Sequence, residues 1–209
     1  MKLIMFDYDG VLIDSLAVTS RIYKDISDAF QLGFPEDLEF YQDLFELDWR
    51  ATMKKINLGE EHWSKTEEIY VEGLRKHKGR VKPYDGIPTV LEALAEHHVL
   101  AIVTNNLRAE VDYTLGQYDL HKYFQASFTS EDGELKPSPD MIHKCLARFD
   151  VKPENAAFIG DMDGDIVSAR AANIGKIIAV SYGYHLTPRL QDADLILDTP
   201  EEILHAFSG

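Results

Sequence analysis

Short apolar runs recur along the chain of 209 residues, and each run ends in polar residues or glycine. A short run of this kind is typical of a strand that is buried on both faces of a sheet. The longer stretches between the runs instead place apolar residues at the spacing of one helix face. We therefore predict β-strands at residues 3–6, 99–103, 126–128, 156–159 and 176–180.

The order of strands and helices predicts the fold class. Amphipathic stretches at 108–117, 139–149 and 165–173 lie between the last four predicted strands. Strands that alternate with helices are joined by right-handed crossovers and form a parallel sheet. The sequence therefore predicts an α/β protein with a parallel sheet.

The stretch between the first two predicted strands has a different pattern. Residues 15–82 contain no strand-like run, and glycine or proline separates several amphipathic segments. Their apolar residues share helix faces: Ile22, Ile26 and Phe30, then Leu38, Tyr41 and Phe45, then Trp63, Tyr70 and Leu74. We predict an inserted subdomain of about four helices at 15–82, and a core made of 1–14 and 83–209. A plain helical subdomain with no role beyond packing would also explain these apolar helix faces.

Composition and charge narrow the class of protein. With 45% hydrophobic, 11% aromatic and 27% charged residues, the chain has an ordinary globular composition. A formal net charge of −15 argues against a nucleic-acid or anionic-membrane surface. Cys145 is the single cysteine and can form no internal disulfide, which favours a reducing compartment. We found no signal-peptide pattern and no apolar run of membrane-spanning length. A cytoplasmic protein is therefore expected.

Two carboxylates directly follow the first predicted strand, in the sequence Asp7-Tyr8-Asp9-Gly10. In an open parallel sheet, ligands bind at the carboxyl ends of the strands. In a continuing strand Asp7 and Asp9 would point to the same face and repel, which requires a cation between them or a raised pKa on one of them. A phosphoryl-transfer site uses one carboxylate as nucleophile and the other as general acid and base. A simple Asp-Gly turn fits the same residues.

A second acidic cluster, residues 160–165, follows the fourth predicted strand and precedes a helix. A calcium loop counted from Asp161 needs Gly at its sixth position and Glu at its twelfth, where Ile166 and Ala172 stand, so that reading fails. Two carboxylate clusters at neighbouring strand ends suit Mg²⁺, which binds a few carboxylates, waters and a phosphate oxygen. Taken by itself, Asp165 is the expected N-cap of the helix that follows.

Two further groups complete the candidate chemistry. Thr104-Asn105-Asn106 ends a predicted strand, and its hydroxyl, amide and backbone N–H groups suit phosphoryl oxygens. Lys136 precedes a predicted helix, where its charge would neutralise the carboxylates and a phosphate. Each has an ordinary alternative, a helix N-cap for the first and a surface lysine for the second.

Taken in chain order, these motifs resemble those of the haloacid dehalogenase superfamily. The motifs are Asp7-Tyr8-Asp9-Gly10-Val11-Leu12, Thr104-Asn105, Lys136-Pro137 and Gly160-Asp161 with Asp165. The match spans the whole chain. The long interval after the first motif resembles the subgroup with a helical cap inserted there, the phosphoglycolate phosphatase and β-phosphoglucomutase type.

The resemblance implies a Rossmann-like core with helices on both faces of the sheet and an inserted helical cap. It implies that Asp7 is the nucleophile that becomes an aspartyl phosphate, and that Asp9 is the general acid and then the base. Mg²⁺ would be held by Asp7, the backbone carbonyl of Asp9 and Asp161, with Asp165 in the outer shell of ligands. The residues implied to hold the phosphoryl group are Thr104, Asn105 and Lys136.

The expected function is a Mg²⁺-dependent phosphatase for a small phosphorylated metabolite, acting as a monomer or homodimer. The cap stretch 44–50 lacks the glycine that such caps often carry before a basic residue, which leaves the substrate open and makes Arg50 the candidate substrate contact. A phosphomutase shares the same half-reaction, but no recognisable polar loop in the cap would hold a bulky sugar in two orientations. The alternative outside the enzymes is a non-catalytic signalling module that is phosphorylated on aspartate, like a receiver domain. Receiver domains, however, lack such a cap.

Overall fold

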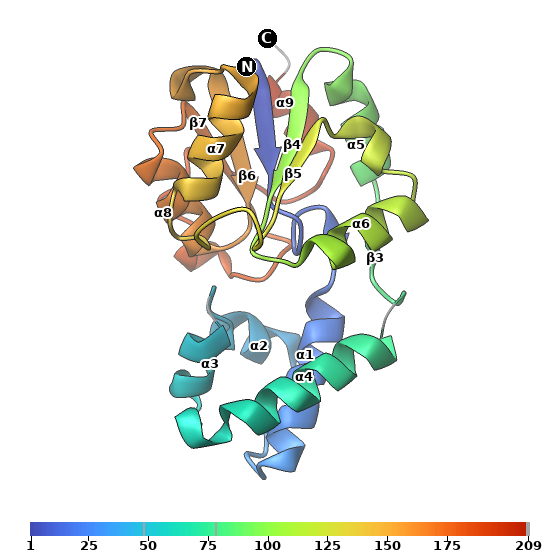
Figure 1. Ribbon diagram of the computed structural model, residues 1–209, viewed down its shortest axis with the longest axis vertical. Coiled ribbons are helices and arrows are strands. Elements are labelled where there is room, and N and C mark those ends of the chain that lie inside the picture. The colour runs from blue at the N-terminus through green and yellow to red at the C-terminus, as the bar shows by residue number, and fades with distance from the viewer. Residues whose placement is uncertain (48, 78, 208–209) are drawn as a thin grey trace.

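The computed structural model describes residues 1–47, 49–77 and 79–207. An α/β core contains the N-terminus and the last helix, and a helical cap lies against one end of it (Figure 1). Within the described residues, no helix has the length and apolar character that crossing a membrane requires.

A six-stranded parallel sheet forms the centre of the core, in the order β5-β4-β1-β6-β7-β8. β1 is central, because Leu3 pairs with Val99 on one side and with Ala156 on the other. The strands are β1 (Leu3–Phe6), β4 (Val99–Val103), β5 (Ala126–Phe128), β6 (Ala156–Gly160), β7 (Lys176–Val180) and β8 (Leu195–Leu197). The predicted parallel α/β fold is therefore confirmed, and β8 is the strand of this sheet that the prediction missed.

Helices cover both faces of this sheet (Figure 1). Because successive side chains of a strand point to opposite faces, Ile4 and Phe6 pack on one side and Leu3 and Met5 on the other. Burial of each such side chain contributes about 1.5–3 kcal/mol, so the two layers fix the strand from both sides. The first side is covered by α5 (Ile87–Ala95), α6 (Arg108–Gln117) and α9 (Glu202–Phe207), and the second by α7 (Asp140–Phe149) and α8 (Asp163–Ala171).

The cap has its own apolar core, which includes the buried Ile22, Ile26, Tyr41 and Met53. α1 and α4 approach closely, because a Cβ at Gly73 would lie only 2.7 Å from Ile22 Cγ1. The cap elements are α1 (Leu16–Ala29), α2 (Leu38–Leu44), α3 (Trp49–Lys55), the 3₁₀ turn η1 (Glu60–His62) and α4 (Trp63–His77). The 3₁₀ turns of the core are η2 (His121–Tyr123), η3 (Pro153–Asn155) and η4 (Thr187–Arg189).

The chain passes between core and cap at two short strands, β2 (Ile13–Asp14) and β3 (Lys82–Pro83). They pair antiparallel, with Ile13 opposite Pro83 and Asp14 opposite Lys82. The two connections therefore lie side by side at the boundary between core and cap, which is where a hinge would allow the cap to move relative to the sheet.

Two local expectations for helix starts are wrong. α8 begins at Asp163 with Met162 as its N-cap, so Asp165 occupies the third helical position and is not the N-cap. The Asp165 carboxylate accepts hydrogen bonds from the backbone N–H groups of Asp161 and Met162. These bonds stabilise a helix that starts at Asp163, two residues before Asp165. Similarly, α6 follows Leu107, so the segment that begins at Thr104 does not cap it.

Candidate active site

The polar residues singled out in the sequence meet at the carboxyl ends of neighbouring strands. Asp7 follows β1, Thr104 follows β4 and Asp161 follows β6, and these three strands are adjacent in the sheet. All three side chains are buried. The sheet topology therefore brings together residues that are far apart in the sequence, at the edge of the core that faces the cap.

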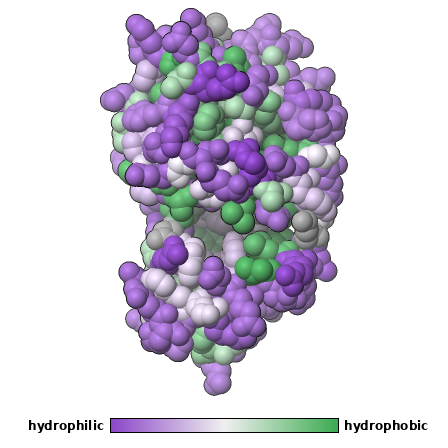
Figure 2. All heavy atoms as spheres, in the orientation of Figure 1, coloured by the Kyte–Doolittle hydropathy of each residue, from purple (hydrophilic) through white to green (hydrophobic). Residues whose placement is uncertain are grey.

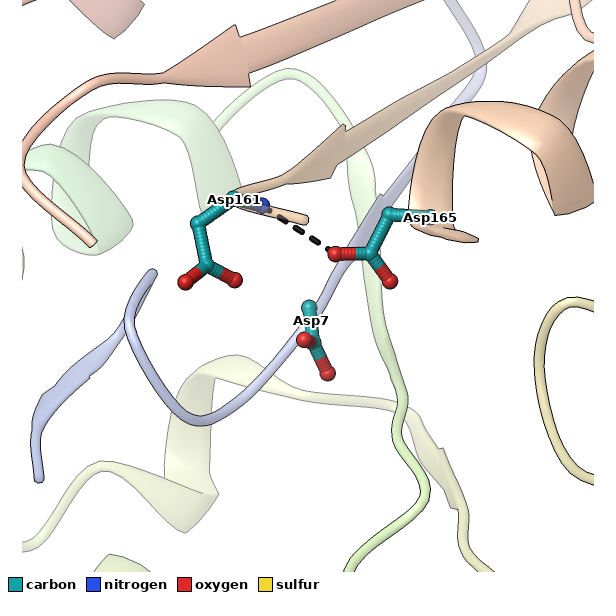
Figure 3. A group of neighbouring side chains, drawn as sticks. All are labelled: Asp7, Asp161 and Asp165. Atoms are coloured by element: carbon teal, nitrogen blue, oxygen red, sulfur yellow. Dashed lines mark hydrogen bonds between the residues drawn. The ribbon is translucent and has the colours of Figure 1, made fainter. Parts of the chain in front are cut away.

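Three carboxylates form the centre of the site. Asp7, Asp161 and Asp165 each offer an oxygen, and these atoms lie within 4.8 Å of one another (Figure 3). Gly10 allows this approach, because its φ of +75° favours glycine and a Cβ there would overlap the Asp161 carboxylate. Asp161 Oδ2 accepts a hydrogen bond of 2.6 Å from the backbone N–H of Tyr184.

The electrostatics of this triad favour a cation. Burial raises the pKa of Asp7 to about 7, and the charge of Asp165 adds to the rise while Lys136 opposes it. Burial and the charges of Asp165 and Asp7 also raise the pKa of Asp161 well above its usual value. Asp161 Oδ1 is buried and has no hydrogen-bond partner. Clustered carboxylate oxygens with one unsatisfied atom fit a hard divalent ion such as Mg²⁺.

Lys136 joins two of the three carboxylates. Its Nζ lies 2.8 Å from Asp7 Oδ1 and 2.6 Å from Asp165 Oδ1, and only 1% of its side chain is exposed. Burial by itself lowers the pKa of Lys136, but the charges of Asp165 and Asp7 outweigh that effect and raise it. Lys136 is therefore a permanent buried cation within the acidic cluster.

Asn105 lines the cavity, and its side chain binds the backbone of Lys136. Its Oδ1 accepts a 2.7 Å hydrogen bond from the backbone N–H of Lys136, and its Nδ2 donates a 3.0 Å hydrogen bond to the Lys136 carbonyl. The amide expected to bind phosphoryl oxygens is thus bound to the protein backbone. The Asn105 side chain fixes the segment that carries the lysine.

Asp9 lies apart from the triad, in a hydrogen-bonded environment of its own. Its Oδ2 accepts a 2.7 Å hydrogen bond from Asn106 Nδ2, and Ser15 forms a second hydrogen bond with the carboxyl group. Burial raises the pKa of Asp9, and these hydrogen bonds only partly oppose the rise. A carboxyl group with a raised pKa is suited to hold and release a proton. From the sequence, Asn106 was expected only as part of the group Thr104-Asn105-Asn106 that suits phosphoryl oxygens, and its hydrogen bond to Asp9 was not predicted.

A cavity of about 540 Å³ lies between the core and the cap. Asp7, Asp9, Thr104 and Lys136 line its core side. Arg50 lines the cap side, where its guanidinium group stacks over the Trp49 ring at 4.9 Å and the Trp63 ring at 5.7 Å. Of the stretch 44–50, Asp48 lies outside the described residues.

A set of polar contacts ties the cap to the core beside this cavity. Arg189 Nη2 lies 2.8 Å from Glu46 of the cap and 2.6 Å from Asp163 of the core, and its Nη1 donates to the Phe45 carbonyl. His185 Nδ1 accepts from the Asp163 backbone N–H, so its Nε2 donates to the same Phe45 carbonyl. Sequence analysis missed this contact set, because no local pattern links residues 140 positions apart.

Comparison with known proteins identifies the family. The model of the haloacid dehalogenase-like hydrolases matches residues 4–180. The chain belongs to this family. A phosphoglycolate phosphatase of Aquifex aeolicus is 33% identical, over 98% of this chain and 95% of that protein. A pyrophosphatase, PpaX, of Bacillus cereus is 32% identical, over 99% of this chain and 96% of that protein.

Solved structures agree with the family assignment. A crystal structure of a predicted phosphatase from Clostridium acetobutylicum aligns with a TM-score of 0.83 and 26% identity, over 99% of this chain and 97% of that one. A haloacid dehalogenase-like hydrolase from Streptococcus pneumoniae shares the fold, with a TM-score of 0.86 at 23% identity over 100% and 99% of the two chains. The predicted superfamily, the Rossmann-like fold and the enzyme class, a hydrolase of the phosphatase type, are confirmed.

Proposed function

We propose that the protein hydrolyses a phosphate monoester of a small metabolite through an aspartyl phosphate on Asp7. The observation that carries this proposal is the placement of Asp7 at the base of the cavity, in contact with buried Lys136 and next to Asp161. The relatives support hydrolysis of phosphorylated compounds, but they include both a phosphoglycolate phosphatase and a pyrophosphatase.

The proposed reaction has two steps. An Asp7 carboxylate oxygen attacks phosphorus, the ester P–O bond breaks, and Asp9 donates its proton to the leaving alcohol oxygen. The Asp9 carboxylate then takes a proton from water, whose oxygen attacks phosphorus and releases phosphate and free Asp7. The burial that raises the pKa of Asp9 favours the protonated form that the first step needs. Thr104 and the backbone N–H of Asn105, at the neighbouring strand end, are proposed to bind the phosphoryl oxygens together with Lys136.

Asp7 and Asp161 are the proposed protein ligands of Mg²⁺, together with the backbone carbonyl of Asp9. Asp165 is proposed to act from the outer shell, because its Oδ1 accepts from Lys136 and its Oδ2 from two backbone N–H groups. When bound, the ion supplies positive charge against the carboxylates and the transferred phosphoryl group.

Removal of the metal is expected to stop turnover and to make the protein less stable as pH rises. In the metal-free state the pKa values of Asp7 and Asp161 lie above the ordinary 3.8, so the folded protein binds more protons than the unfolded chain. Stability is then lost as pH increases from about 4 to about 7. Mg²⁺ at one hundred times its Kd should restore activity and raise Tm at pH 7.5 by about 5–10 °C. Equal activity and equal Tm in excess chelator would contradict the metal site.

Asp9→Asn is expected to lower kcat by about 10²–10⁴-fold, because the leaving group loses its acid and water loses its base. Rapid-quench measurements with a ³²P-labelled ester should show slow formation of the phosphoenzyme and slower breakdown. The matched variant Asn106→Ala keeps the carboxyl group but removes one hydrogen bond to it. It should shift the alkaline limb of the kcat/KM–pH profile to higher pH, because the first step needs protonated Asp9 and that hydrogen bond favours the ionised form. Normal turnover of Asp9→Asn would mean that another residue is the acid.

Arg50 is the proposed cap contact to the substrate. Arg50→Ala is expected to lower kcat/KM by about two- to fivefold through loss of a stacking cation, with a smaller change in kcat. Arg75→Ala is the matched control, because Arg75 lies at the end of α4 and 73% of its side chain is exposed. If Arg50→Ala and Arg75→Ala have the same kcat/KM across a panel of phosphate esters, Arg50 is an ordinary surface arginine.

The central test is the release of inorganic phosphate from p-nitrophenyl phosphate, with and without Mg²⁺. A signalling module would show no multiple turnover. Incubation with hexose 1-phosphates tests the phosphomutase alternative. Stoichiometric phosphate release supports hydrolysis, whereas isomerisation to a hexose 6-phosphate with little phosphate released would overturn it.

A further inference from the structure

The part of the cavity beyond the strand ends is mainly apolar and aromatic. Its cap side is formed by Tyr23, Phe45, Trp49, Met53, Tyr70 and Leu74. Ligand pockets lined in this way bind organic groups by burial of apolar area, and a few polar residues fix their orientation. At this site, Asp7, Asp9 and Thr104 are polar lining residues at the strand ends, and Arg50 and Glu67 are polar lining residues of the cap.

The charges that line the cavity do not suit a second anionic group on the substrate. Among the described lining residues, Lys136 and Arg50 are the cations, and Lys136 is bound to two carboxylates. Glu67 and Glu110 line the same cavity, from α4 and α6. A carboxylate or a second phosphate placed among aromatic side chains and these acids would lose hydration with little compensation.

Exposed apolar side chains continue this wall to the cavity mouth. Val71 of the cap is 48% exposed, and Leu107 and Leu135 of the core are 53% and 48% exposed. All three line the cavity. Apolar residues gather around the hollow at the waist of the molecule, between core and cap (Figure 2). Exposed apolar side chains contributed by two separate parts of a protein to one opening are typical of a binding site.

We propose that the substrate of this chain is a phosphate monoester whose alcohol part is an uncharged apolar group, long enough to reach from Asp7 to the rim formed by Val71, Leu107 and Leu135. This proposal rests on the proposed phosphatase function. With the phosphoryl group at Asp7, the organic group extends along the apolar wall. Each methylene group that reaches this wall leaves water and adds to binding.

A homologous series of n-alkyl phosphates from ethyl to hexyl tests this proposal. The leaving alcohols have nearly the same acidity, so differences in kcat/KM report contact with the cavity. We expect kcat/KM to rise about fourfold per methylene group until the chain reaches the rim. Hexyl phosphate should also exceed phosphoglycolate, whose carboxylate meets the apolar wall. A flat series, or the highest kcat/KM with phosphoglycolate, would overturn the proposal.

A pair of exposed valines provides a matched control. Val71→Ser removes an apolar side chain from the rim, whereas Val167→Ser changes a valine on α8 that is 53% exposed and does not line the cavity. Both substitutions are at exposed positions, so folding should be retained, which Tm verifies. Val71→Ser should lower kcat/KM for hexyl phosphate by about threefold or more, and by a larger factor than for ethyl phosphate. Equal effects of the two variants on hexyl phosphate would overturn the role of the rim.

The outcomes separate this proposal from the function on which it rests. Activity toward p-nitrophenyl phosphate or ethyl phosphate in Mg²⁺ depends only on the site at the strand ends. If that activity is present and chain length has no effect, the phosphatase function stands and the apolar substrate class is wrong. If no ester is hydrolysed, the proposed function itself is wrong.

Discussion

Asp7→Asn is expected to abolish multiple turnover, with a loss of about 10⁴-fold or more in kcat. An amide has nearly the same shape as the carboxylate but cannot form the aspartyl phosphate. Phosphate release from p-nitrophenyl phosphate in saturating Mg²⁺ measures the loss. Asp112→Asn on α6 is the control, because this aspartate is exposed and does not line the cavity.

The fold of Asp7→Asn should be retained, which separates a chemical defect from a structural one. Burial raises the pKa of Asp7 to about 7, so its ionised form is disfavoured in the metal-free protein. Above that pH the neutral amide removes an unfavourable buried charge, while Asp165 still pairs with Lys136 at 2.6 Å. In chelator at pH 8, Tm should therefore equal or exceed that of the wild type. Substantial residual turnover by a folded variant would exclude Asp7 as the nucleophile.

The sequence was sufficient to predict that certain site residues lie together, because they follow parallel strands that end at the same edge of the sheet. Asp7 and Asp161 each follow an apolar run, and the rule that parallel strands end at one edge of the sheet brings them together without any further information. The helices of the cap could also be predicted, since their apolar residues have helix spacing. β8 was missed because Leu195–Leu197 is a short edge strand next to Asp194 and lacks a fully buried run.

Side-chain partners that come from separate segments could not be predicted. One example is the side-chain amide of Asn105, which binds the backbone of Lys136, 31 positions away. Arg189 and Glu46 pair across 143 positions, and neither lies in a motif. Such contacts depend on how the cap sits on the core, a property that local spacing does not contain. The apolar rim at Val71 is of the same kind, because each of its residues looks like ordinary surface in the sequence.

Lys136→Met is expected to be the most destabilising single change in the site. Removal of one partner from a buried ion pair typically costs about 3–5 kcal/mol, which corresponds to a fall in Tm of about 6–20 °C. Activity should fall by about 10²–10³-fold, because a positive group near the transferred phosphoryl group is lost. Lys144→Met is the control. Lys144 is half exposed and pairs with Asp140 on the protein surface, so its loss should cost about 1 kcal/mol or less.

The pH dependence of this Lys136→Met defect identifies its electrostatic origin. The pKa of Lys136 is raised above 10.5, so its own stabilising charge is constant at neutral pH and is lost only in strong alkali. The carboxylates change instead, because Asp7 and Asp161 take up protons as pH falls and their repulsion is relieved. The difference in Tm between wild type and variant should therefore be large at pH 8 and smaller at pH 5. A difference independent of pH would indicate lost packing in place of uncompensated charge.

A second substitution tests whether the uncompensated charge is that of Asp165. This carboxylate has no exposed surface in its side chain, and Lys136 is its cationic partner at 2.6 Å. Adding Asp165→Asn to Lys136→Met removes the unpaired charge, while the amide oxygen still accepts from the backbone N–H groups of Asp161 and Met162. The double variant should therefore unfold at a higher temperature than Lys136→Met alone, with a coupling free energy of about 1–3 kcal/mol. Additive losses in Tm would show that the lysine and the aspartate stabilise the fold independently.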